Sequence, residues 1–137
     1  MSDPKWLAIA RKELGVVEPE AEKYFTATDY GPAGPTTPYC AAFVNWVLHK
    51  AGFKSVVLPK DKGTGHADAI GFARWGKDVS KDKPVGAVVV FTWSSGGHHV
   101  AFYAGAGVFL GGNQTGAHKV WEESLPLGRA IAWRWPA

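Results

Sequence analysis

Apolar residues in the first half of the chain recur at the spacing of α-helices. The first apolar stripe consists of Trp6, Leu7, Ala10 and Leu14. It follows Asp3-Pro4, a capping residue with a first-turn proline, and it ends at Gly15. The second stripe consists of Phe43, Val44, Val47, Leu48 and Ala51. It follows Thr37-Pro38, so we predict a helix from Tyr39 to about Ala51, besides one after Pro4 and shorter ones at 20–28 and 64–75.

The second half of the chain has the shorter period of β-strands. Apolar or alternating runs, separated by turns rich in Gly or containing Pro, lie at 85–92, 98–104, 108–113, 118–122 and 130–135. Helices followed by strands favour an α+β domain with an antiparallel sheet over repeated βαβ units. We therefore predict N-terminal helices, including the one near Cys40, packed on a sheet of five to six antiparallel strands.

Length and composition narrow the class of protein. The chain has 137 residues and one cysteine, which fits a single domain over 1–137 without a disulfide framework or a thiolate-rich zinc site. The net charge of +3 is not concentrated in a basic run, so we expect no nucleic-acid partner. No apolar stretch approaches the roughly 18 residues of a membrane span, and we expect none.

Cys40 is the first candidate for chemistry, because the predicted helix places it in the first turn. A helix N-terminus lowers the pKa of a thiol through its unpaired N–H groups and its macrodipole, and the thiolate is the nucleophilic form. The alternative is that a lone cysteine in a small domain is a buried packing residue. Position alone leaves both interpretations open.

Two adjacent histidines on a predicted strand are the next candidates. Neighbouring strand residues point to opposite faces, so only one of His98 and His99 can meet Cys40. The face of His99 continues with Ala101, whose small side chain leaves room there for a helix end. The alternative is one histidine in the core and one on the surface.

Two amides after the following strand are candidates for a third site residue. The side-chain oxygen of Asn113 can accept the imidazole N–H and fix the histidine tautomer. Gln114 is its neighbour and faces the other side of a regular strand. The alternative is that both residues simply open a turn.

Signals for metals, phosphates and a serine nucleophile are missing. His66, His98, His99 and His118 do not have the spacing of a metal site such as HExxH. The chain contains neither a phosphate-binding glycine motif nor the Gly-x-Ser-x-Gly elbow. We therefore expect no metal and no cofactor.

Four ordered segments carry a resemblance to a known family. They are Thr37-Pro-Tyr-Cys-Ala-Ala-Phe-Val-Asn-Trp-Val-Leu, Pro84-Val-Gly-Ala-Val-Val-Val-Phe, Gly97-His-His-Val-Ala-Phe-Tyr-Ala-Gly and Leu110-Gly-Gly-Asn-Gln. With these segments the chain resembles the NlpC-type and CHAP-like papain-fold peptidoglycan hydrolases, notably the single-domain endolysins of phages and prophages. The likeness runs from Pro4 to the C-terminal Trp133-Arg-Trp.

The resemblance implies a papain-like fold and a cysteine peptidase or amidase that cleaves an amide bond in bacterial peptidoglycan. It assigns the nucleophile to Cys40, the base to His99 and the third residue to Asn113. His98 stands where the family usually has a small or polar residue. Candidates for substrate binding or for the oxyanion are Tyr30, Tyr39, Trp93, His98 and Gln114.

The resemblance also implies how the protein works in the cell. We expect an endopeptidase rather than an N-acetylmuramoyl-L-alanine amidase, acting as a monomer without a separate wall-binding domain. The alternatives are a secreted interbacterial amidase toxin of the same fold and a non-catalytic wall-binding module. The start of the chain has no apolar signal core, so we expect synthesis in the bacterial cytoplasm. A holin or a secretion system would then release the protein to the periplasm and cell wall.

Overall fold

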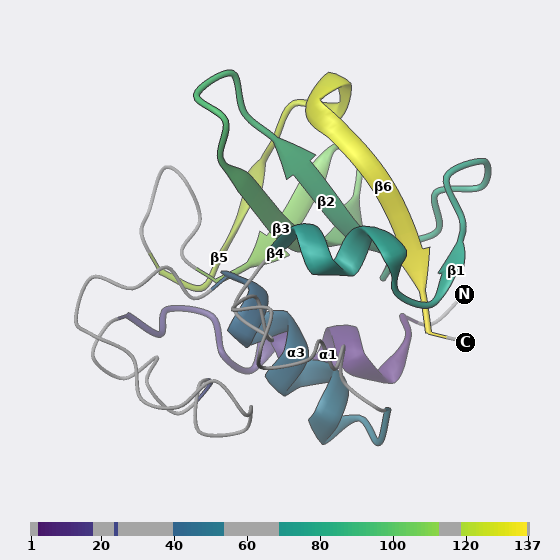
Figure 1. Ribbon diagram of the computed structural model, residues 1–137. Coiled ribbons are helices and arrows are strands. Elements are labelled where there is room, and N and C mark those ends of the chain that lie inside the picture. The colour runs from purple at the N-terminus through teal and green to yellow at the C-terminus, as the bar shows by residue number, and fades with distance from the viewer. Residues whose placement is uncertain (1–2, 18–23, 25–39, 54–68, 113–118, 137) are drawn as a thin grey trace, which may run out of the picture.

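The computed structural model describes residues 3–17, 24, 40–53, 69–112 and 119–136. Within them, the α-helices α1 (Lys5–Arg11) and α3 (Cys40–Lys50) lie on one side of a β-sheet (Figure 1). The sheet has six strands, all antiparallel to their neighbours, in the order β1-β6-β2-β3-β4-β5. This arrangement confirms the predicted α+β class with helices on an antiparallel sheet.

The strands are β1 (Lys77–Asp78), β2 (Val88–Thr92), β3 (His98–Gly105), β4 (Val108–Gly111), β5 (Trp121–Ser124) and β6 (Ala130–Trp135). The short 3-10 helices are η3 (Ala69–Arg74) and η4 (Leu127–Arg129). The predicted helix at 64–75 is thus a 3-10 helix in its described part, and the helix predicted at 20–28 lies outside the described residues except for Tyr24. Strand β1 was not predicted. It forms because Lys77 and Asp78 pair with the end of β6.

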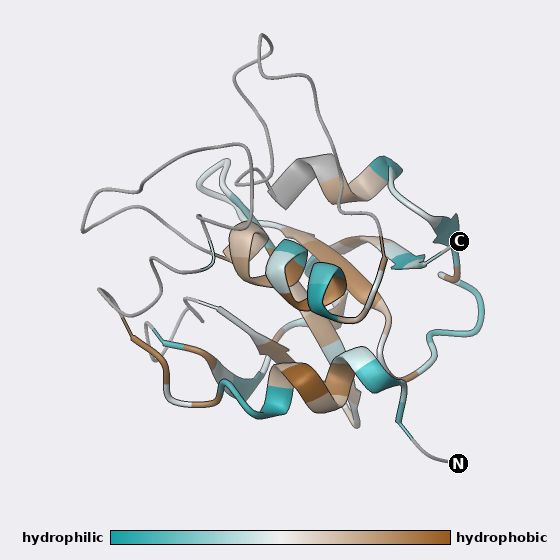
Figure 2. Ribbon diagram, turned by 90° about the horizontal axis from the view of Figure 1, so that it is seen from below, coloured by the Kyte–Doolittle hydropathy of each residue, from teal (hydrophilic) through white to brown (hydrophobic). Residues whose placement is uncertain are grey.

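Both faces of the central strands are buried, which explains the unbroken apolar run in β2. On the helix side, Val100 and Phe102 of β3 lie beneath α3, and Phe102 meets Phe43 edge to face with ring centroids 6.4 Å apart. The opposite face carries a second apolar layer made of Ala87, Val89, Phe91, Ala101, Phe109, Leu125 and Trp133. Figure 2, seen from the helix side, shows hydrophobic residues on the strands behind the helices.

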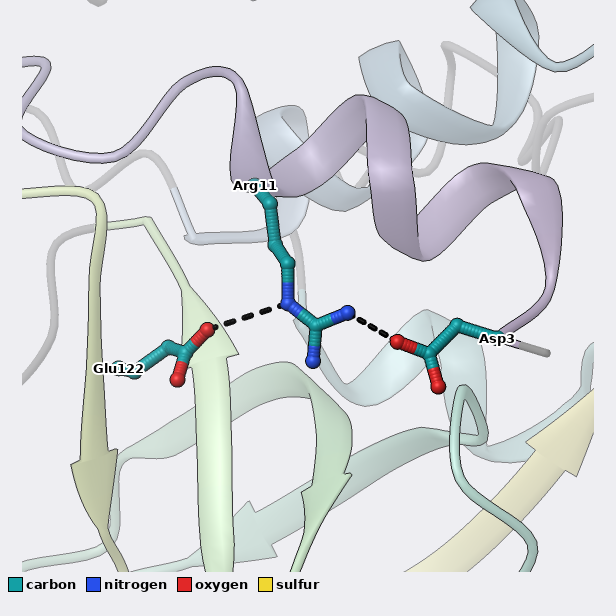
Figure 3. Close-up of polar contacts among 3 residues, drawn as sticks. All are labelled: Asp3, Arg11 and Glu122. Carbon is teal, nitrogen blue, oxygen red and sulfur yellow. Dashed lines mark hydrogen bonds and ion pairs between the residues drawn. The ribbon is translucent and has the colours of Figure 1, made fainter. Parts of the chain in front are cut away.

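Contacts at both ends of α1 hold this helix on the sheet. At its start, the Trp6 indole donates to the carbonyl oxygen of Gly86 over 2.8 Å. After its end, Gly15 donates to the carbonyl oxygen of Val120 over 2.7 Å, just before β5. Between them, the Arg11 guanidinium contacts Asp3 and lies 3.4 Å from Glu122 of β5 (Figure 3). The ion pairs are partly exposed, so the buried indole and the backbone bonds carry most of the anchoring.

Candidate active site

Cys40 is the first residue of α3, and packing of that helix on β3 decides where its thiol lies. The side chain is only 7% exposed and belongs to the apolar cluster between the helices and the sheet. The first N–H groups of an α-helix have no acceptor within the helix, so they are available to groups at its N-terminus. The predicted place of Cys40 in the first turn is confirmed by the helix boundary.

Two backbone N–H groups donate to the Cys40 sulfur, one from Ala41 and one from Val100. Tyr103 of β3 donates to Ala87 near β2, so by alternation the N–H of Val100 points toward the β4 side of the strand. The pairing of β4 with β3 reaches only as far as Leu110 and Phe102, two residues short of Val100. The Cys40 thiol therefore accepts a hydrogen bond from the Val100 N–H at a point where the pairing of β3 with β4 has ended.

The His99 side chain also hydrogen-bonds the Cys40 thiol. The pKa of the thiol is set by opposing influences: burial raises it, while the hydrogen bond and charge of His99 and the two N–H donors lower it. The lowering influences prevail, so the pKa of Cys40 lies below its ordinary value. A lowered pKa increases the fraction of the thiol that is present as thiolate, the nucleophilic form, at a given pH.

The imidazole of His99 reaches the sulfur although it projects from the face of β3 that turns away from the helices. His99 shares this face with Ala101, and α3 packs over Val100 and Phe102 instead. The expectation that the helix end lies beside Ala101 was therefore wrong. A backbone N–H lies near the plane of its sheet, so the sulfur that accepts from Val100 sits beside the strand, where a side chain on either face can approach it.

Comparison with known proteins places the chain in a family. Residues 29–118, more than half of the chain, match the family described as the CHAP domain. This chain belongs to the CHAP domain family. A protein of Listeria innocua named probable endopeptidase p60 is 33% identical over 98 residues, which are 71% of this chain and 19% of that protein. Its namesake in Listeria seeligeri is 31% identical over 98 residues, 71% of this chain and 17% of the relative. The chain thus spans less than a fifth of the curated relatives it matches.

In this CHAP domain, the two adjacent histidines lie in different environments. His98 is exposed and lies opposite Thr92 of β2. His99 is 4% exposed, lies opposite Phe91 and contacts the thiol of Cys40. The structure therefore brings Cys40 together with His99, as the sequence predicted for one of the pair.

The remaining predicted site residues fall into two groups. Trp93, directly after β2, is half-buried, with its ring against those of His99 and Phe91. The other candidates lie outside the described residues of the CHAP domain: Tyr30, Tyr39, Asn113 and Gln114. In the described ranges, no group of three or more His, Cys, Asp or Glu side chains is arranged to hold a metal ion, and no helix has the length and hydrophobicity to cross a membrane.

Two features of the CHAP domain were not predicted from the sequence. The N–H groups of Ala41 and Val100 contribute to the site through the backbone, which no residue pattern reveals. The second feature is Asn45 in α3, which is fully buried with neither side-chain N nor O paired to any described group. The available signal for it was a polar residue surrounded in the sequence by Phe43, Val44, Trp46 and Val47.

Proposed function

We propose that this CHAP domain hydrolyses an amide bond of the peptidoglycan stem peptide, with Cys40 as nucleophile and His99 as acid and base. The observation that carries the proposal is the thiol at the head of α3 hydrogen-bonded to an imidazole, with its pKa lowered despite burial. Peptidoglycan as substrate is supported by the family and by the Listeria relatives named probable endopeptidase p60.

The reaction has two stages. The Cys40 thiolate attacks the carbonyl carbon of the amide, and the His99 imidazolium donates a proton to the departing amine, leaving a thioester. Water then attacks the thioester while His99 takes its proton, which releases the acid product and restores the thiolate. The backbone N–H of Cys40, at the helix start, is suited to hold the oxyanion, because it has no acceptor within the helix.

The third residue and the bond specificity belong to the same proposal. Asn113 orients the imidazole by accepting its second N–H. We favour cleavage within the stem peptide over cleavage of the N-acetylmuramoyl-L-alanine bond, because the relatives are named as endopeptidases. The substrate lies outside the inner membrane of bacteria, so this activity requires transfer of the protein to the wall.

Digestion of purified peptidoglycan followed by mass spectrometry tests the proposal. An endopeptidase leaves part of the stem peptide on muramic acid, whereas an amidase releases the whole stem beginning at L-alanine. We expect Cys40→Ala and His99→Ala to abolish product formation, and His98→Ala, the matched neighbour on the same strand, to retain most of it. Undiminished product from Cys40→Ala refutes the cysteine mechanism, and binding of peptidoglycan without any product from the wild type indicates a binding module.

A further inference from the structure

We propose that Trp93 is a positioning residue for His99: its indole ring, lying against the imidazole, keeps that ring directed at Cys40 and favours its positively charged form. The inference rests on the proposed Cys40–His99 chemistry and goes beyond it by naming what holds the histidine in place. Trp93 thus acts on the catalytic base His99, in addition to the substrate-binding role that the sequence suggested for it.

The first support is the geometry of three rings at the paired ends of β2 and β3. The rings of Trp93 and His99 are inclined by 29° with centroids 6.3 Å apart. Phe91 stacks on Trp93 at 5.6 Å and 11°, and lies 6.2 Å from His99. These separations are those of offset-stacked aromatic pairs. An aromatic face carries negative charge density, so an adjacent imidazolium is favoured over a neutral imidazole.

The second support is that the backbone fixes Trp93. Its N–H donates to the carbonyl oxygen of Gly97 over 2.9 Å, and its own carbonyl accepts from Gly96 over 2.9 Å. Gly96 has a φ of +95°, which favours glycine and closes this short loop between β2 and β3. With its backbone tied to the loop and its ring stacked on Phe91, the indole has a defined place beside His99.

The third point is which titratable groups the described elements packed around β3 bring near the imidazole. The strands on either side of β3 carry no titratable side chain, since β2 reads VVVFT and β4 reads VFLG. On β3 itself, the neighbouring His98 is exposed. From α3, the titratable group that contacts His99 is Cys40, whereas His49 and Lys50 belong to the last turn of the helix.

Alkylation of Cys40 by iodoacetamide between pH 5 and 9 tests the inference without peptidoglycan. In Trp93→Leu we expect the acid limb of the rate profile to move up by about 0.5 pH unit, because the thiolate loses part of its imidazolium partner. Trp93→Phe retains an aromatic face and should keep the wild-type profile. Turnover of a soluble peptidoglycan fragment by Trp93→Leu should show a several-fold lower kcat with KM nearly unchanged.

Trp133→Leu is the matched control, because it makes the same change in the same apolar layer. Its ring contacts Tyr103 and Phe109. We expect a lower melting temperature and an unshifted alkylation profile. Circular dichroism checks each fold, and Trp93→Met, which keeps more side-chain volume, is used if Trp93→Leu is unfolded.

The possible results distinguish a failure of the positioning role of Trp93 from a failure of the proposed function. A Cys40 that is no more reactive than free cysteine in the wild type overturns both. A reactive wild-type Cys40 whose profile is unchanged in Trp93→Leu overturns the positioning role alone. A raised KM with an unshifted profile also overturns it, because that result assigns Trp93 to substrate binding only.

Discussion

Replacing His99 by Ala should reverse the direction in which the protein shifts the pKa of Cys40. Burial is the largest single influence on this pKa and raises it, and the hydrogen bond and charge of His99 are the next largest and lower it. Without the imidazole, burial is opposed only by the N–H groups of Val100 and Ala41. We therefore expect the pKa of the Cys40 thiol in His99→Ala to lie above its ordinary value.

The size of the effect follows from the thiolate fraction. Below the pKa of a thiol, its alkylation rate falls about tenfold for each pH unit, because only the thiolate reacts. A downward shift is replaced by an upward one, so the rate at pH 7 should fall, by about tenfold for each pH unit by which the pKa rises. In the wild type, the lowered pKa should place the acid limb of the profile below that of glutathione.

Iodoacetamide labelling followed by intact-mass spectrometry from pH 5 to 9 measures these rates, with glutathione as the reference thiol. His98→Ala is the matched control, because His98 is the exposed neighbour of His99 on β3, and its profile should overlay the wild type. If His99→Ala reacts at pH 7 within about twofold of the wild type, the reasoning is refuted, and the helix N-terminus with its N–H groups is the source of the lowered pKa.

Two further predictions concern the scaffold. Gly86→Ala should lower the free energy of unfolding by about 2 kcal/mol or more, because φ is +100° there and an added Cβ would lie 2.3 Å from the Pro4 ring. Gly52→Ala is the control for urea unfolding: it has a φ of +93° and open space around the added Cβ, so a loss equal to that of Gly86→Ala would contradict the steric argument. Asn45→Val should raise the melting temperature by a few degrees, because it removes a buried amide without described partners, whose desolvation costs about 1–3 kcal/mol. A clearly lower melting temperature would show that the amide has a partner.

The sequence by itself determined the elements whose signals are local. The proline and glycine around the stripe from Phe43 to Ala51 delimit a helix, and the helix found at Cys40–Lys50 agrees with them to within a residue. The change from helical to strand periodicity was enough to predict the α+β class. Strand alternation was also enough to place His98 and His99 on opposite faces of β3. These inferences hold because each depends only on the residue spacing within a helix or a strand.

Only the tertiary structure decided which groups meet. The choice of His99, the face of β3 covered by α3 and the pairing of Lys77–Asp78 with β6 depend on register and packing between segments far apart in the chain. The donor from Val100 exists because β4 stops pairing with β3 before it, and the stacking of Trp93 on His99 depends on how a loop returns the chain. Such contacts are set by long-range packing and backbone geometry, which no local pattern of residues encodes.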